Sequence, residues 1–196
     1  MRFQAFAALT LVSTLTIAPA AAQEFGGPRL EVRAGYDALS VNDAYEDLPG
    51  HLAGPAVTGA IGYDHALSAR ITLGLELGLT LPTGGSRSAQ LGLDRLTIEP
   101  DRDIDILVRL GRAVGDRTLL FAKVGYANSK VQATYETGAG PIETERFSSS
   151  QDGVRIGAGV EHIIARGLSA TAEYRFTAYD DHVRRNHAAI GLAYRF

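Results

Sequence analysis

The feature that most constrains this chain is a strict alternation of apolar and other residues, clearest between residues 70 and 80. Leu73, Leu75 and Leu77 alternate there with glycine, glutamate and threonine. A period of two places the leucines on one face of a β-strand, whereas a helix would scatter them around its circumference. The sequence therefore predicts an all-β protein whose strands separate two different environments.

The same pattern recurs along the chain in stretches separated by turn-forming residues. The eight predicted strands span residues 29–37, 56–64, 70–80, 103–111, 118–128, 152–163, 168–177 and 186–196. The connections alternate between long and short, and the long ones include 38–55, 81–102 and 129–151. This rhythm is typical of an up-and-down membrane barrel with surface loops and periplasmic turns. We expect eight antiparallel strands, with 186–196 closing the barrel against the first strand.

The polar faces of these strands indicate which side is inside. Alternation alone also fits a soluble lipocalin-like barrel with its apolar face inward. The polar faces, however, carry many glycines, which weaken a solvated strand but leave room for long neighbours inside a narrow barrel. They also mix both signs of charge, which can pair across a dry lumen. The predicted polar network of the lumen contains Glu31, Arg33, Glu76, Asp105, Arg109, Lys123, Arg155, Glu161, Glu173 and Arg175.

Aromatic residues give a further indication once strand directions are assigned from the loop rhythm. The set at the outer boundary contains Tyr36, Tyr126, Tyr174 and Phe176. The set at the periplasmic boundary contains Tyr63, Tyr194 and Phe196. Two aromatic girdles are typical of transmembrane barrels, although scattered sheet aromatics in a soluble barrel remain the alternative.

Residues 1–22 have the pattern of a signal peptide. Arg2 precedes a mostly apolar stretch, and the small residues from Ala18 to Ala22 are suited to cleavage before Gln23. A retained N-terminal helix is the alternative. We expect residues 23–196 to form the barrel domain, located in the cell outer membrane.

Composition excludes several classes of protein. The chain has no cysteine, so a disulfide framework and a cysteine-based metal or redox site are both excluded. A formal net charge of -3 is too small to suggest nucleic-acid binding. Mean hydropathy near zero excludes a helical membrane protein but fits strands that average out.

The chain resembles a known family over nearly all of residues 23–196, and the C-terminal third shows the resemblance most directly. DGVRIGAGVEHIIARGLSATAEYRFTAYDD, followed by HAAIGLAYRF, is similar to the last three strands of small outer-membrane barrels. These are the opacity-protein and OmpA/OmpX-like "porin family" proteins of Gram-negative bacteria. The resemblance implies that the last strand carries the signal read by the barrel-assembly machinery. The residues that match this signal are Ile190, Leu192, Tyr194 and Phe196.

The function that we expect follows from the small size of the barrel. Side chains nearly fill the interior of eight strands, so the lumen should be plugged or very narrow. This favours a non-enzymatic structural or surface-interaction role, such as envelope integrity or adhesion through extracellular loops. A narrow channel for small solutes is the alternative. We expect no cofactor and no metal site.

A lipid A-modifying enzyme is a more remote alternative. Such an enzyme would pair a histidine with a serine or an acid near the outer leaflet. His182 and His187 lie near Asp180 and Asp181, and the serines 148–150 lie in another predicted loop. No compact catalytic or metal-ligand spacing appears, which favours solvated loop residues.

Cations at or beyond the outer rim suggest the partners. They are Arg87, Lys130, Arg146, Arg184 and Arg185. They either pair with phosphates of lipopolysaccharide or are ordinary solvated charges. The expected partners are outer-membrane lipid and lipopolysaccharide, the barrel-assembly machinery and a surface ligand bound through the loops, but no nucleic acid.

Overall fold

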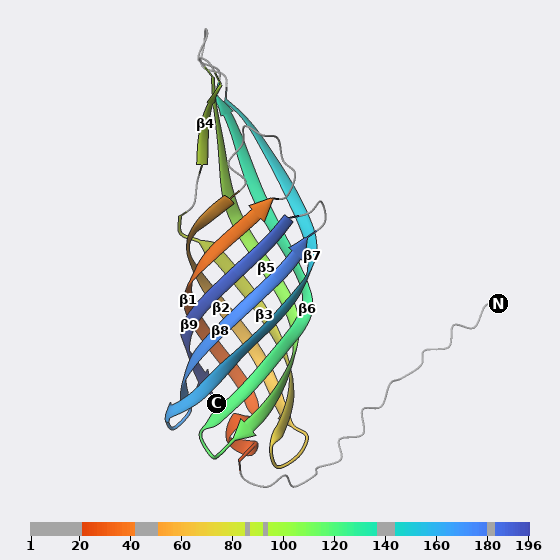
Figure 1. Ribbon diagram of the computed structural model, residues 1–196. Coiled ribbons are helices and arrows are strands. Elements are labelled where there is room, and N and C mark those ends of the chain that lie inside the picture. Colours follow the sequence, from red (N-terminus) through yellow and green to blue (C-terminus); the bar gives the residue numbers. More distant parts are fainter. Residues whose placement is uncertain (1–20, 42–50, 85–86, 92–93, 137–143, 180–182) are drawn as a thin grey trace, which may run out of the picture.

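The described part of the molecule is built almost entirely from β-strands (Figure 1). The computed structural model describes residues 21–41, 51–84, 87–91, 94–136, 144–179 and 183–196. A short 3-10 helix, η1 (Gln23–Phe25), comes first. The strands are β1 (Gly27–Val41), β2 (His51–Ala66), β3 (Ile71–Pro82), β4 (Arg87–Leu91), β5 (Asp94–Val114), β6 (Thr118–Glu136), β7 (Thr144–Ala165), β8 (Leu168–Tyr179) and β9 (Val183–Arg195).

All the described strands except β4 close into one antiparallel barrel. Strands that follow one another in the chain pair with one another, β3 pairs with β5, and β9 pairs with β1. In the β1–β9 pair, Leu30 lies opposite Tyr194 and Val32 opposite Leu192. The predicted eight-stranded barrel and its closing pair are therefore confirmed. Closure leaves no open sheet edge within the barrel wall.

The polarity of the barrel wall is inverted relative to a water-soluble barrel. Leu75 and Leu77 are 59% and 49% exposed, whereas Glu76 between them is 1% exposed. Across the sheet, Arg109 of β5 is 0% exposed. Large apolar side chains cover the outer surface, as expected for strands in contact with lipid. The lipocalin-like alternative is therefore wrong. Among the described residues, no helix is long and apolar enough to cross a membrane.

The barrel has two different ends. Three short turns lie at the end where η1 and Phe196 are found, and we call this the inner end (Figure 1). Two of the turns contain Gly115 and Gly167, whose φ angles of 69° and 73° favour glycine. The other end carries the longer connections, and we call it the outer end.

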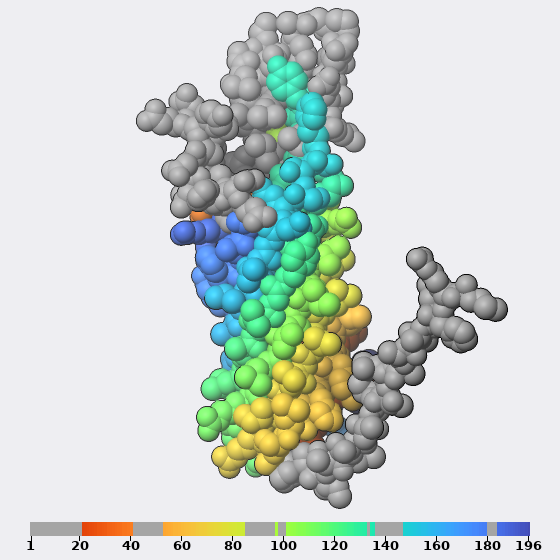
Figure 2. Space-filling model, turned by 90° about the vertical axis from the view of Figure 1, so that its right-hand side faces the viewer, coloured from red at the N-terminus to blue at the C-terminus, as the bar shows by residue number. Residues whose placement is uncertain are grey.

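The prediction of long loops over residues 81–102 and 129–151 is wrong in large part. β5 and β6 remain paired as far as Arg95 and Glu136, and β6 and β7 remain paired as far as Thr144. β4 adds a short strand beside β5. We call this extension, residues 87–91, 94–100, 131–136 and 144–151, the projecting sheet (Figure 1; part of it is teal and cyan at the top of Figure 2). Its backbone pairing continues beyond the barrel, where lipid and lumen no longer impose an alternation of side chains.

Candidate functional site

The ten residues predicted to form the polar network all lie in the lumen. Each of them is at most 5% exposed. They come from β1, β3, β5, β6, β7 and β8, so that the network links most of the barrel wall. Buried charges are tolerated only when they are paired and hydrogen-bonded, which makes their partners the central question.

Glu76 of β3 is the centre of the network. Its carboxylate accepts hydrogen bonds from Arg29 at 2.7 Å, from Arg33 at 3.0 Å and from Lys123 at 2.8 Å. Glu173 of β8 is the second anion, and it also binds Arg33 and Lys123. Lys123 and Arg33 each bind both carboxylates and thus link β3 and β8 on opposite sides of the lumen.

Glycines give this network its space. A Cβ atom at Gly78 would lie 2.5 Å from Oδ1 of Asp105, and one at Gly191 would lie 2.5 Å from Cγ of Arg33. Both contacts are shorter than carbon atoms can tolerate, so only glycine permits the observed side-chain positions. This agrees with the role expected for the glycines on the polar faces.

The inner end of the lumen is closed by charged and apolar side chains together. Arg109 donates to Asp64 at 2.8 Å and to Glu161 at 2.7 Å. Phe25 of η1 is fully buried against Leu119, and Arg195 donates a hydrogen bond to the backbone carbonyl of Phe25. The segment before β1 therefore covers the inner opening of the barrel.

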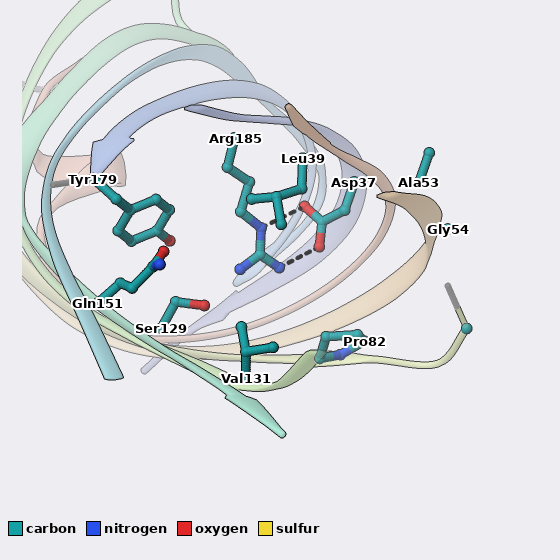
Figure 3. A pocket seen from close by; sticks show the side chains of 11 residues that line it. Asp37, Leu39, Ala53, Gly54, Pro82, Ser129, Val131, Gln151, Tyr179 and Arg185 are labelled. Carbon is teal, nitrogen blue, oxygen red and sulfur yellow. Dashed lines mark hydrogen bonds and ion pairs between the residues drawn. The ribbon is translucent and has the colours of Figure 1, made fainter. Parts of the chain in front are cut away.

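The outer end of the lumen forms a shallow cup (Figure 3). Its empty volume, including the part open to solvent, is about 470 Å³. Arg185 lies at its base and makes a two-pronged pair with Asp37, as well as a 2.7 Å contact with Asp103. Leu39 and Val131 supply apolar walls. Arg185 thus connects the lining of the cup to the ion pairs of the lumen.

The charge of the lumen is balanced. Within the described ranges, eight buried arginine and lysine side chains face eight buried aspartate and glutamate side chains. Such an interior has no excess charge to select ions, and the side chains of an eight-stranded barrel nearly fill its lumen. The geometry fits a plugged barrel that is cross-linked by ion pairs.

Several lumen residues were missed by the sequence prediction. They are Arg29, Asp37, Asp64, Asp103, Tyr179, Arg185, His187 and Arg195. Each lies on the inward-facing parity of its strand. Six of them lie within the predicted strands but were not included in the predicted network, whereas Tyr179 and Arg185 lie one or two residues beyond a predicted strand. Phe25 precedes the first predicted strand and carried no such signal.

Two expectations about the outer rim are wrong. Arg185, expected at or beyond the rim, is buried and ion-paired because β9 begins before it. His187, interpreted as a solvated loop residue, is also buried, and its Nδ1 lies 2.6 Å from Asp37. Its Nε2 has no partner among the described residues. The described part of the chain also holds no cluster of three or more residues suited to a metal ion.

The remaining predicted residues lie on the outer surface or outside the described structure. His182, Asp180, Asp181 and residues 1–20 fall outside the described residues, as do the side chains of Arg87 and Arg146. The serines 148–150 are exposed on β7. Phe176 is half-buried on the outward face.

The predicted girdle residues face outward at two levels. Tyr36 and Tyr174 lie on either side of Ala188 in one row. Tyr126 donates a hydrogen bond to Asp152, and this bond lowers the pKa of the Asp152 carboxyl just beyond the apolar band. At the inner end, Tyr194 and Phe196 meet edge to face with their ring centroids 5.1 Å apart. Ile190 and Leu192 are exposed on the same face of β9.

The sequence has a recognisable family. Residues 7–196 match the family described as "Outer membrane protein beta-barrel domain". No curated protein matches the sequence significantly.

Solved structures share the fold. The chain is similar to Ail, the attachment invasion locus protein of Yersinia pestis, with 16% identity and a TM-score of 0.55, covering 87% of this chain and 99% of that one. Ail in complex with the heparin analogue sucrose octasulfate matches with 17% identity and a TM-score of 0.54, with the same coverage. Neisserial surface protein A matches with 12% identity and a TM-score of 0.56, covering 87% and 97% of the two chains.

A closed lumen should not conduct ions across a bilayer. Planar-bilayer recordings of the purified full chain should show no stable conductance steps, because ion pairs cross the lumen and Phe25 packs at its inner end. Protein-free detergent at the same dilution is the control. Reproducible graded steps that appear only with protein would contradict the closed lumen.

The substitution Glu76→Gln should destabilise the barrel. It removes the negative charge that Arg29, Arg33 and Lys123 share, so we expect the free energy of unfolding to fall by about 3–5 kcal/mol. Urea unfolding in lipid vesicles measures this change. Glu24→Gln makes the same chemical change on an exposed side chain and should stay within about 0.5 kcal/mol. Equal losses in the two variants would refute a central role for Glu76.

Proposed function

This chain belongs to the outer membrane protein beta-barrel domain family, and we propose that it is a non-enzymatic cell-surface protein that binds partners through its projecting sheet. Its place is the cell outer membrane. In this proposal, the outer end of the barrel faces the cell surface and the inner end faces the periplasm. The projecting sheet is the part that binds.

The observation that carries the proposal is an open strand edge at the outer end. β7 pairs with β6 along residues 144–152, but its pairing with β8 begins only at Gly153. On the β8 side, residues 144–152 therefore have no neighbouring strand in the described structure. An open edge can accept an extended segment of another protein as an additional strand.

The side chains of this edge suit a binding surface. Phe147 is 59% exposed, and the serines 148–150 beside it are exposed as well. An exposed aromatic next to free backbone groups offers both an apolar anchor and hydrogen bonds. The balanced, ion-paired lumen supports this surface role over the channel alternative, since the lumen itself offers no binding or transport path.

The parts of β6 and β7 that lie in the projecting sheet can be shortened without changing the barrel. Replacing residues 132–150 with a short glycine-serine turn should leave the barrel folded, because β6 and β7 still pair from Ser129 and Gln151 toward the inner end. We expect adhesion of expressing cells to fall to the level of cells that lack the protein.

The adhesion assay would use layers of host cells, heparin-coated surfaces and uncoated surfaces. Heparin is included because a structure of Ail holds a heparin analogue. The control replaces residues 42–50, in the connection between β1 and β2, with the same turn. Full adhesion without residues 132–150, or equal loss in the control, would refute the proposal.

We further propose that residues 1–22 are a signal peptide and that the outward face of β9 is the assembly signal. The residues of this signal are Ile190, Leu192, Tyr194 and Phe196. β9 pairs with both β8 and β1, so its correct placement completes the barrel.

Removing the terminal aromatic ring should reduce barrel assembly. Phe196→Ala should lower the yield of folded protein in the outer membrane several-fold, whereas Phe196→Tyr should retain it, because a tyrosine at this position would keep an aromatic ring beside Tyr194. Gel migration with and without heating measures the folded fraction. An unchanged yield for Phe196→Ala would exclude this role.

A further inference from the structure

Two cations face each other on the lipid-facing side of the barrel near its outer end. Arg102 of β5 lies directly opposite Lys130 of β6, and Lys130 lies directly opposite Ser150 of β7. Arg102 and Ser150 are exposed, and Lys130 is half-buried. The three side chains thus form one row across three adjacent strands. We call Arg102, Lys130 and Ser150 the cationic row.

This row is unfavourable by itself. Residues directly opposite on one face have Cβ atoms about 4.5–5.5 Å apart, and like charges at this spacing destabilise a sheet. Neither Arg102 nor Lys130 has an ion pair or a side-chain hydrogen bond with any described residue. The repulsion therefore remains uncompensated within the described part of the protein.

The backbone places Arg102 in this position. The register of β5 against β6 shifts between Pro100 and Arg102, so that Asp101 is an extra residue. Such a bulge redirects the side chains on either side of it. Below the bulge, Asp103 points into the lumen and binds Arg155, while Arg102 points outward beside Lys130.

The neighbouring acids whose side chains the structure describes do not neutralise the row. Asp152 lies on the same outward face, one row nearer the inner end. Its carboxylate accepts hydrogen bonds from Tyr126 and, at 2.6 Å, from Asn128. These bonds direct Asp152 toward the aromatic girdle and away from Lys130. Asp101, the bulge residue, has no ion pair with Arg102.

An apolar surface begins two rows nearer the inner end, beyond the row that contains Asn128 and Asp152. Ile106, Tyr126 and Val154 form a row there, and they are 54%, 48% and 61% exposed. A ligand that binds both the cationic row and this apolar row must carry an anion at one end and a hydrocarbon chain at the other. A membrane lipid with a phosphorylated headgroup has this composition and already surrounds the barrel.

We propose that Arg102, Lys130 and Ser150 bind a phosphate group of lipopolysaccharide, with its acyl chains packed against Ile106, Tyr126 and Val154. The guanidinium of Arg102 can donate two parallel hydrogen bonds to phosphate oxygens, Lys130 supplies a point charge, and the Ser150 hydroxyl supplies a further donor. Bound phosphate converts the repulsion between the two cations into a shared attraction. The proposal rests on the proposed direction of the barrel, with its outer end at the cell surface, and it shares Ser150 with the projecting sheet, but it does not require that sheet to bind a partner.

The test compares three proteins in detergent with defined lipids. Native mass spectrometry of the full chain would measure binding of lipopolysaccharide to the wild type, to the variant R102Q/K130Q and to R184Q. Arg184 is the matched control, because it is an exposed rim arginine of β9 whose neighbours in its row are Ser40 and Ala178. We expect binding to weaken by about tenfold for each cation removed from the row and by less than about twofold in R184Q.

Three ligands separate the possible sources of the phosphate. Dephosphorylated lipopolysaccharide should bind the wild type as weakly as intact lipopolysaccharide binds R102Q/K130Q. Phosphatidylglycerol and inorganic phosphate should bind the wild type at least about tenfold more weakly than intact lipopolysaccharide. Equal binding of either would overturn the assignment to lipopolysaccharide, and wild-type affinity in R102Q/K130Q would overturn the site.

Thermal stability supplies a second readout, because the difference in unfolding temperature between K130Q and the wild type should change sign when lipopolysaccharide is added. Without lipopolysaccharide, K130Q should unfold at the same temperature as the wild type or higher, because it relieves the repulsion from Arg102. With lipopolysaccharide, the wild type should be the more stable protein, because only its folded state binds the lipid tightly. If R102Q/K130Q does not assemble, the single variant K130Q replaces it in the lipid-binding measurement. The same order of stability in both media would refute the site.

Discussion

The constraint on which the structure depends is that a backbone inside a hydrocarbon layer must satisfy all its own hydrogen bonds. A sheet achieves this only when it closes, and the pairings of β9 with β1 and of β3 with β5 complete the closure. Closure then creates two surfaces of opposite character. The outer one is apolar because it meets lipid, and the inner one is free to be polar because it never does.

The interior uses this freedom for ion pairs instead of an aqueous channel or an apolar core. Glu76, Glu173 and Lys123 are buried, yet each has charged partners within hydrogen-bonding distance. Arginine is well suited to this environment because its planar group binds several carboxylates at once. Gly78 and Gly191 show that the fit is tight enough to exclude even a methyl group at some positions. The result is a wall held together across its interior as well as along its strands.

Much of the structure could be predicted because a single two-residue periodicity determines both the strands and the residues that face the lumen. Alternation identifies a strand, its outward residues and its inward residues together, and it gave the barrel, the closing pair and the ten buried network residues. Alternation could not predict β4 or the outer extensions of β5, β6 and β7, because side chains there do not face lipid on one side and the lumen on the other. It could not show that Arg185 turns inward beside Asp37, since that depends on where β9 begins. Phe25 lies outside any strand, and the pairing of Arg102 with Lys130 depends on a bulge.

The distribution of the Glu76 contacts along the chain has a consequence for how the protein enters the bilayer. Its partners Arg29 and Arg33 come from β1, and Lys123 comes from β6, more than forty residues away in either direction. A partly formed sheet would carry these charges without their counterparts, and hydrocarbon would reject them. The charge of Glu76 can therefore be neutralised only when strands that are distant in the sequence come together. Insertion and ring closure become a single cooperative event, in which the last strand brings the lumen to electrical balance as it completes the wall.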